Sequence, residues 1–285
     1  MLYVLLIITG LALGSFVNAL VWRVYEQAKI TDQIEHGKKL TKADKVALEK
    51  LSIAQGRSMC LHCKHELAPK DLIPVLSWLS LRGKCRYCGQ RIPDTPVAEL
   101  LVPALFVASY VWWPYALNTD LAWFVFAAWL GIIIGFVALT LYDFRWFLLP
   151  DRIVFPLTGI GVVYVALRAL EASSPLQVVG GSIWAVVILA GLFYALFTVS
   201  NGRWIGGGDV KLAILLGLVV GGPIEALLVI FISSLTGLGF MLPNLLKGEA
   251  TGKSIVPFGP FLIAGTILVV LFGQQLIDWY LGALI

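Results

Sequence analysis

The chain has 285 residues, of which 59% are hydrophobic and only 13% charged, and its mean hydropathy is +0.88. Soluble domains are nearer half apolar and about a quarter charged. The composition therefore excludes an ordinary soluble domain, and the small net charge of +4 gives no indication of nucleic-acid binding.

Long uncharged stretches of the chain predict membrane-spanning helices. Two short stretches, 153–167 and 212–224, are apolar enough to cross if their flanking charged side chains reach the interface. Six others approach or exceed the roughly 20 residues that span hydrocarbon as a helix: 1–22, 100–119, 121–142, 172–202, 226–246 and 254–277. We expect an all-α polytopic membrane protein with about eight transmembrane helices.

Positive charge is concentrated in one segment. Residues 23–91 hold 14 of the 21 Lys and Arg residues, which predicts that this segment is cytoplasmic. Eight spans then place every other positive loop on the same side, apart from Arg168, and leave both termini outside. We expect three parts: a first transmembrane helix at 1–24, a cytoplasmic segment at 25–95, and a membrane domain at 96–285.

All four cysteines lie in a compact part of the cytoplasmic segment, residues 57–95, as two Cys-x-x-Cys pairs. They are Cys60, Cys63, Cys85 and Cys88, with 21 residues between the pairs. Two such pairs can surround one tetrahedral Zn²⁺, and a reducing cytoplasm disfavours disulfides. We expect a small structural module resembling a zinc ribbon, with a redox pair or reduced thiols as the alternative. His62 and His65 flank the first pair and are expected to lie outside the ligand set.

Two acidic residues fall where lipid should exclude them, which by default indicates function. Asp143 directly follows the uncharged stretch 121–142, and Asp209 follows three glycines. The predicted topology places both at the same membrane face, where they can meet. Two adjacent carboxylates share one proton, so that one serves as base toward water and the other as acid toward a carbonyl. The pair therefore predicts aspartyl protease chemistry.

Residues near these two acids bear on the predicted catalytic pair and on the alternatives to it. Gly206 and Gly208 give the chain the freedom to leave helical geometry and to approach a substrate closely. Asp151 competes with Asp143 for the first catalytic role, although it stands where a helix-capping acid belongs. Glu99 likewise suits the first turn of a helix. The alternative is that both membrane acids are ordinary helix-end residues.

Motifs over nearly the whole chain complete this pattern. Besides the two cysteine pairs they are Gly14-Ser15-Phe16-Val17-Asn18, Ile73-Pro74, Ser77, Gly83-Lys84-Cys85, Pro96, Glu99-Leu100, Leu148-Leu149-Pro150-Asp151, Gly206-x-Gly208-Asp209-x-Lys211 and Pro257-Phe258-Gly259-Pro260. Together they resemble the motifs of type IV prepilin peptidases, the Gly-x-Gly-Asp aspartyl leader peptidases of type IV pilus and type II secretion systems.

The resemblance implies that Asp143 and Asp209 are the catalytic pair and that the four cysteines form a metal-type module. It also implies that the substrates are prepilins and pseudopilins, cleaved after a glycine at the cytoplasmic face of the inner membrane. Many such enzymes N-methylate the new terminus with S-adenosylmethionine. The resemblance therefore implies S-adenosylmethionine as a second cofactor, in addition to zinc. Membrane lipid is a further expected partner, and nucleic acid is not.

Two other classes of function remain as alternatives. An ion- or proton-coupled transporter also uses membrane acids, but places them deep in the bilayer and often in repeated halves. A zinc-scaffolded component of secretion machinery needs no catalytic acids. A phosphate-binding loop is excluded, because Gly248 and Gly252-Lys253-Ser254 are separated by three residues where four are needed.

Overall fold

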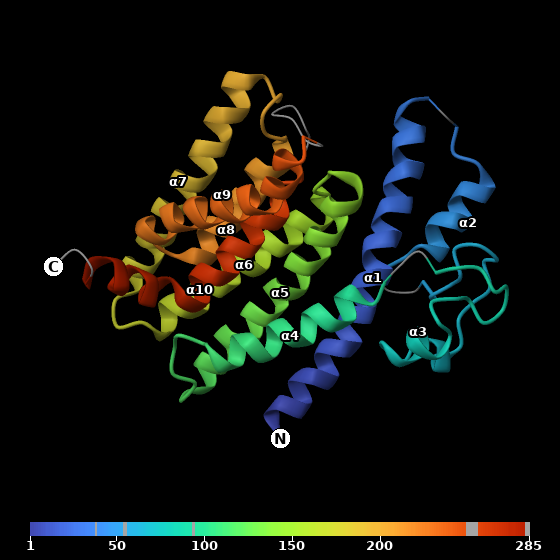
Figure 1. The fold of residues 1–285 in the computed structure, drawn as a ribbon, viewed down its shortest axis with the longest axis horizontal. Coiled ribbons are helices and arrows are strands. Elements are labelled where there is room, and N and C mark those ends of the chain that lie inside the picture. The colour runs from blue at the N-terminus through green and yellow to red at the C-terminus, as the bar shows by residue number, and fades with distance from the viewer. Residues whose placement is uncertain (38, 54–55, 93–94, 249–255, 283–285) are drawn as a thin grey trace. The chain divides into compact units, whose positions relative to one another are not determined.

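The structure is a computed structural model that describes residues 1–37, 39–53, 56–92, 95–248 and 256–282 (Figure 1). The described residues form helices and connecting loops, with two isolated β-bridges and no strand, so the predicted all-α class is confirmed. The rejected phosphate-loop motif at Gly252-Lys253-Ser254 lies outside the described residues. In chain order the elements are α1 (Leu2–Glu35), α2 (Lys42–Lys50), the 3₁₀ turn η1 (Pro69–Asp71), α3 (Leu76–Ser80), α4 (Val97–Val111), α5 (Asp120–Trp146), α6 (Asp151–Glu171), α7 (Pro175–Ser200), α8 (Gly207–Val220), α9 (Pro223–Leu246) and α10 (Gly259–Gly282).

Six of the described helices are long and apolar enough to cross a membrane, namely α1, α5, α6, α7, α9 and α10. About eight were expected, and the difference comes from two shorter apolar helices. Helix α4 has 15 residues and α8 has 14, which gives lengths of roughly 21 to 22 Å at 1.5 Å per residue. The hydrocarbon core is roughly 30 Å thick, so both helices are shorter than its full thickness.

The expected span over 100–119 is wrong in its extent. Although this stretch has no charged residue, α4 ends at Val111. Pro114 follows shortly after, and a proline disfavours helical backbone in the residue before it. The expected short span over 153–167 is confirmed, because this stretch lies inside the 21-residue helix α6, which is long and apolar enough to cross a membrane.

The described chain divides into two compact units, residues 1–108 and 109–285. In the first unit, α1 packs closely against α4 because glycines leave room for the neighbouring backbone. A Cβ atom on Gly10 would lie 2.6 Å from the Cα atom of Pro103, and one on Gly14 would lie 2.7 Å from the Cα atom of Glu99. Side chains larger than hydrogen at these two positions would push the helices apart.

Helix α1 continues well beyond the expected boundary at residue 24, and the chain after it folds back toward it. Arg23, only 6% exposed, donates hydrogen bonds to the carbonyl oxygens of Ser52, Ile53 and Gly56 at 3.2, 3.2 and 2.7 Å. Buried guanidinium groups need such partners. Arg23 therefore ties the segment after α2 to α1, a role that its place at the end of the first apolar stretch did not indicate.

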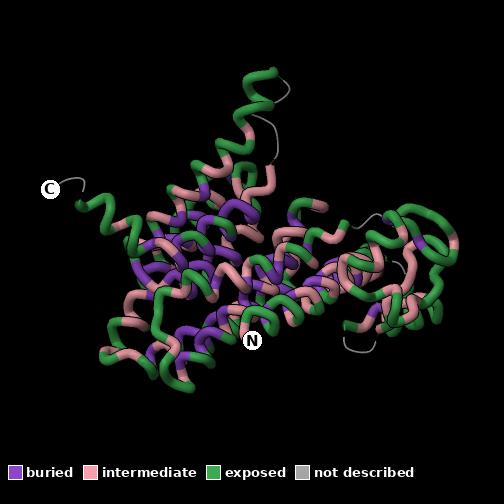
Figure 2. The backbone as a smooth tube through the Cα atoms, turned by 60° about the horizontal axis from the view of Figure 1, so that its bottom comes forward, coloured by how far each residue is buried: buried purple, intermediate pink, exposed green. Residues whose placement is uncertain are grey.

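The second unit is a helical bundle with α8 inside it. Helix α8 packs against α6, α7 and α10, while α5 packs against α6 and α10, and α9 against α7 and α10. Buried positions gather where these helices meet (Figure 2). Large side chains fill that core, and the buried Trp129 donates its indole hydrogen bond to Ser109 Oγ at 2.9 Å.

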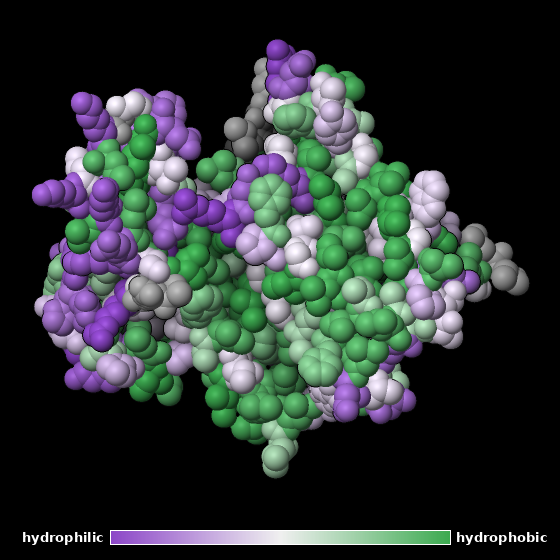
Figure 3. All heavy atoms as spheres, turned by 180° about the vertical axis from the view of Figure 1, so that it is seen from behind, coloured by the Kyte–Doolittle hydropathy of each residue, from purple (hydrophilic) through white to green (hydrophobic). Residues whose placement is uncertain are grey.

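The outward surface of the second unit is apolar. Exposed large hydrophobic side chains follow α7 and α9, including Ile183, Trp184, Val187, Val199, Leu227, Phe231 and Leu235. Figure 3 shows hydrophobic side chains over this bundle, and hydrophilic ones over the part that holds α2 and the cysteines. An apolar exterior of this extent suits lipid and not water.

Candidate active site and metal centre

Asp143 lies in the last turn of α5 and is buried, with 5% of its surface exposed. The helix ends just after it, because Phe147 adopts left-handed backbone and donates its N–H to the Asp143 carbonyl oxygen at 2.8 Å. The backbone N–H of Gly259 donates to the Asp143 carboxylate. A Cβ atom on Gly259 would lie 2.6 Å from Asp143 Oδ2, so only glycine fits here without a shift.

Asp209 lies in the first turn of α8, at the end of the glycine turn. Its Oδ2 atom accepts a hydrogen bond from the Gly206 backbone N–H at 3.3 Å, which caps the helix. Gly208 faces Leu149, whose Cβ atom would lie 2.9 Å from a Cβ atom on that glycine. Leu149 also packs against Gly259. The glycine turn and the Gly259 turn therefore meet around one leucine.

These contacts bring the two acids together although they are 66 positions apart in the sequence. The carboxylates of Asp143 and Asp209 lie close enough to interact electrostatically. The helices that carry them belong to one packed unit, since α10 contacts both α5 and α8. The two carboxyl groups therefore belong to one packed unit and lie within range of electrostatic interaction.

Asp151, the competitor for the first catalytic role, has a different partner. Lys211 Nζ lies 2.7 Å from its Oδ1 and 2.8 Å from its Oδ2, in an exposed ion pair. Asp151 begins α6 and Lys211 lies in the first turns of α8, so the pair links two helix starts. This contact accounts for both residues without a catalytic role.

The four cysteine sulfurs of the first unit form a compact cluster, all within 4.8 Å of one another, and all four are free thiols. Cys60 Sγ and Cys88 Sγ lie 3.8 Å apart. Tetrahedral Zn²⁺ with bonds of about 2.3 Å places its sulfur ligands about 3.8 Å apart. The donor set therefore fits a metal ion such as zinc.

Each cysteine pair is held by the same backbone turn. The carbonyl oxygen of Cys60 accepts the N–H of Lys64 at 3.0 Å, and that of Cys85 accepts the N–H of Gly89 at 2.9 Å. Lys64 and Gly89 both have positive φ, +58° and +69°. The two loops are thus a structural repeat that follows from local hydrogen bonds.

Without an ion, the crowding of the four thiols disfavours ionisation of Cys88. A backbone hydrogen bond at Gln90 favours the Cys88 thiolate, but burial and the neighbouring thiols outweigh it and raise the pKa of Cys88 to about 11. A divalent cation at the centre of the cluster would displace the protons and stabilise the thiolates.

The two histidines beside the first pair are outside this cluster, as expected. The His65 ring packs on the Tyr87 ring, with centroids 3.8 Å apart. His62 is exposed and borders a pocket of the first unit.

Two acids in the first unit have roles that the sequence did not indicate. The Asp71 side chain, 3% exposed, binds Arg86 Nε at 2.6 Å and Tyr87 Oη at 2.9 Å, which ties η1 to the second cysteine loop. Glu99, expected only in the first turn of α4, also accepts the backbone N–H of Val75. That N–H precedes α3, and Val75 has a strained φ of +60°.

Fold and site together define a helical membrane protein with two interacting aspartates in one unit and a four-cysteine cluster that fits a metal ion in the other. Comparison with known families gives the same class. Residues 8–113 match the family model described as Bacterial Peptidase A24 N-terminal domain, and residues 130–242 match the Type IV leader peptidase family.

Curated relatives agree over nearly the full chain. A prepilin leader peptidase/N-methyltransferase of Aeromonas hydrophila is 31% identical, covering 97% of this chain and 93% of its own length. One of Bacillus subtilis is 33% identical, covering 81% of this chain and 88% of its own length. No solved structure matches the chain. The chain belongs to the type IV leader peptidase family and is a multi-pass inner-membrane enzyme.

Proposed function

We propose that this protein cleaves the leader peptides of type IV prepilins and pseudopilins, with Asp143 and Asp209 as the catalytic pair. The supporting observation is the meeting of these two carboxyl groups in one packed bundle, while Asp151 pairs with Lys211. The names of the relatives support the substrate class. Membership of a peptidase family disfavours a transporter or a purely structural zinc protein.

The chemistry requires one ionised and one protonated carboxyl group, which a facing pair provides by sharing a proton. The ionised group takes a proton from water, whose oxygen attacks the scissile carbonyl carbon. The protonated group donates its proton to the carbonyl oxygen. The C–N bond then breaks: the leaving amine takes the proton held by the base, and a hydroxyl group of the intermediate returns a proton to the other carboxylate as the new carboxyl group forms.

Substrate access to this pair is proposed to run along the glycine turn. Gly206 has extended backbone and Gly208 has no side chain, so a substrate strand can approach the backbone beside Asp209. The proposed active face is cytoplasmic, because Arg145, Arg152 and Lys211 lie at the same helix ends as the acids. This orientation leaves both termini outside, and the proposed domain limits remain 1–24, 25–95 and 96–285.

Substitution of the two acids tests the peptidase proposal. The full-length protein in lipid vesicles is incubated with a prepilin, and cleaved product is measured by mass spectrometry. Asp143→Asn and Asp209→Asn are each expected to lower the rate by about 10³-fold or more. Asp278→Asn changes an exposed acid of α10 that hydrogen-bonds Gln274, and is expected to cleave normally. Undiminished cleavage by either of the first two variants rejects the pair.

The proposed metal of the module is structural zinc. Four thiolate ligands leave no open coordination position, so the ion would hold the two cysteine loops together and not activate water. Cys60, Cys63, Cys85 and Cys88 would hold it.

A second activity is proposed for the first unit: N-methylation of the newly formed amino terminus. The relatives carry N-methyltransferase in their names, and the first unit contains a pocket apart from the aspartate pair. S-adenosylmethionine would supply the methyl group.

A further inference from the structure

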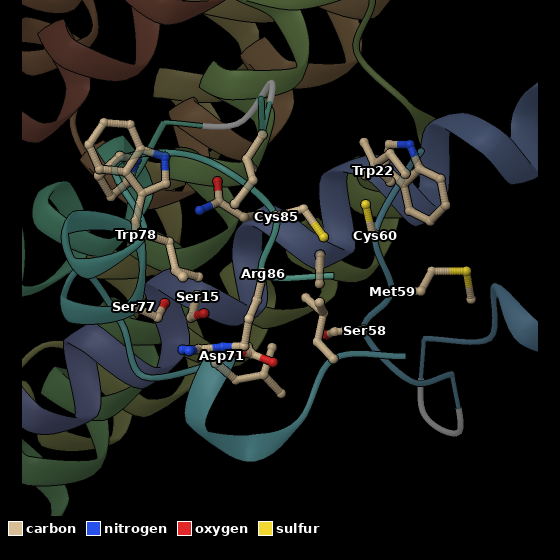
Figure 4. A pocket seen from close by; sticks show the side chains of 18 of the residues that line it. Ser15, Trp22, Ser58, Met59, Cys60, Asp71, Ser77, Trp78, Cys85 and Arg86 are labelled. Carbon is tan, nitrogen blue, oxygen red and sulfur yellow. Dashed lines mark hydrogen bonds and ion pairs between the residues drawn. The ribbon is translucent and has the colours of Figure 1, made fainter. Parts of the chain in front are cut away.

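The second unit contains a pocket of about 190 Å³ at the end of α8. It is distinct from the pocket of the first unit, which Figure 4 shows with Trp22 and Trp78 at opposite ends. Val219 and Val220, the last residues of α8, line the pocket of the second unit, whereas Asp209 lies in the first turn of the same helix. The pocket and the aspartate pair are therefore at opposite ends of α8, and the peptidase proposal makes no use of the pocket.

Two opposite charges lie beside the glycine turn that joins α8 to α9. A Cβ atom on Gly221 would lie 3.2 Å from Arg168 Nη1, and one on Gly222 would meet Glu225 Oε2. The guanidinium and the carboxylate thus lie over neighbouring residues, yet neither forms an ion pair with any residue in the described part of the chain. Ionisable side chains at membrane depth are usually paired, so a bound group that contacts both charges would complete the arrangement.

Aromatic rings hold the Arg168 guanidinium beside the pocket. Its Cζ atom lies 4.4 Å from the centroid of the Tyr115 ring and 5.8 Å from that of the Tyr164 ring, and Tyr115 lines the pocket. Glu171 interacts electrostatically with Arg168 but accepts its hydrogen bond from Thr119 Oγ1, at 3.1 Å. A guanidinium presents N–H donors at the edge of its plane, and these suit phosphate oxygens.

The pocket itself offers acceptors for an ammonium group. Glu225 lines it from the first turn of α9, within electrostatic range of Tyr115. In the described chain its carboxylate does not cap α9 in the way that Asp209 caps α8. Gln274 lines the pocket from α10 and donates its amide N–H to Asp278 Oδ1 at 2.9 Å, which leaves its amide oxygen as an acceptor. A carboxylate, an amide oxygen and an aromatic ring suit a primary ammonium group.

We propose that this pocket binds the headgroup of a phospholipid that carries a primary ammonium group, with the ammonium at Glu225 and the phosphate at Arg168. Ile224 and Leu227 flank Glu225 on α9 and are exposed, so they can contact the acyl chains of the same lipid. These apolar neighbours favour a lipid over a soluble zwitterion. The small volume of the pocket suits a compact headgroup and not a large cofactor. The site does not depend on the proposed peptidase activity.

A comparison of lipids on the parent protein tests the site without any substitution. The full-length protein in detergent micelles is mixed with equal amounts of phosphatidylethanolamine and phosphatidylcholine of the same acyl chains, and bound lipid is measured by native mass spectrometry. Phosphatidylethanolamine is expected to be retained about tenfold more, because the trimethylated nitrogen of phosphatidylcholine has no N–H group to donate. The N-methyl and N,N-dimethyl forms should fall between the two. Equal retention of all four lipids overturns the proposal.

Substitutions assign the two halves of the headgroup. Glu225→Gln keeps the side-chain size but removes the charge, and it should bring the preference for phosphatidylethanolamine close to one. Arg168→Gln should weaken the binding of both lipids by about tenfold, since both carry the phosphate. Asp120→Asn removes an exposed acid from the first turn of α5 and is the control, with the parent's preference expected.

An unchanged preference in Glu225→Gln would overturn the assigned ammonium site. If Arg168→Gln fails to fold, as judged by circular dichroism, Glu225→Gln and the series of methylated lipids still decide the outcome.

A soluble competitor distinguishes the lipid from its free headgroup. Free phosphoethanolamine should displace the bound lipid only in large excess, because it lacks acyl chains. Displacement at equal concentration would overturn the lipid as the ligand. Asp143→Asn is expected to lose leader cleavage and to keep the parent's lipid preference, so the peptidase and lipid-site proposals fail separately.

Discussion

The aspartate pair and the cysteine cluster are assembled in different ways. The cysteine loops form from hydrogen bonds four residues apart, and they would be held together by a metal ion. The aspartates meet only because α5, α8 and α10 pack together, with Leu149 between two glycines. Damage to the cysteine cluster should therefore stay local, whereas one misplaced atom near the aspartate pair should impair catalysis directly.

The largest expected effect is the loss of the metal. In Cys85→Ser the zinc content should fall from about one ion per chain to near zero, because structural zinc sites contribute roughly 10 kcal/mol or more of apparent binding free energy. Protease sensitivity within residues 57–92 should rise, as measured by limited proteolysis with mass spectrometry. Leader cleavage should persist, since the acids lie in the other unit.

His62→Ala is the matched control for this loss. The histidine neighbours the first cysteine pair but lies outside the cluster. Full zinc content in this variant is expected. Zinc that survives Cys85→Ser, or disappears in His62→Ala, would contradict the assigned ligands.

The next effect is on the aspartate pair. Gly259→Ala places a methyl group 2.6 Å from Asp143 Oδ2 and should lower the cleavage rate by about 10²-fold, because small misplacements of catalytic groups are costly. Gly239→Ala on α9 meets no atom within 4 Å and serves as the control. Equal rates for the two variants would show that the packing around Asp143 does not matter for catalysis.

The smallest expected effect concerns Asp71, whose side chain links η1 to the second cysteine loop. Burial alone would raise the pKa of Asp71, but hydrogen bonds from Arg86, Tyr87 and the Ala68 N–H outweigh it and lower this pKa below its usual value. A lowered folded-state pKa stabilises the fold above the unfolded-state value, and this contribution is lost as the pH falls through the folded-state value. Asp71→Asn should therefore destabilise the module at neutral pH, by roughly 1 to 2 kcal/mol.

Hydrogen exchange of the module amides measures this difference. The gap between the parent and Asp71→Asn should be constant from about pH 5 to 8 and shrink below about pH 4. A gap that widens in acid would reverse the assigned sign.

Much of the fold and of the candidate sites could be predicted from the sequence. The all-α class follows from uncharged stretches, and the cysteine cluster follows from its spacing. The extent of α4 could not be predicted, because a lack of charged residues does not distinguish a helix from the turn at Pro114. The roles of Arg23 and Glu99 depend on backbone groups far along the chain, and the role of Asp71 depends on the side chains of Arg86 and Tyr87. None of these contacts leaves a pattern in composition. Asn18 stood in a recognised motif, but only the structure shows that its buried Oδ1 atom has no hydrogen-bond partner among the described residues.

The shortness of α8 has a consequence for the surrounding bilayer. At 14 residues it falls about 9 Å short of the hydrocarbon thickness, and other helices flank it, so lipid cannot thin locally to match it. The shortfall must instead be made up by hydration at its ends. Water would then penetrate to the depth of Asp209, which gives a hydrolytic enzyme its second reactant within an apolar medium.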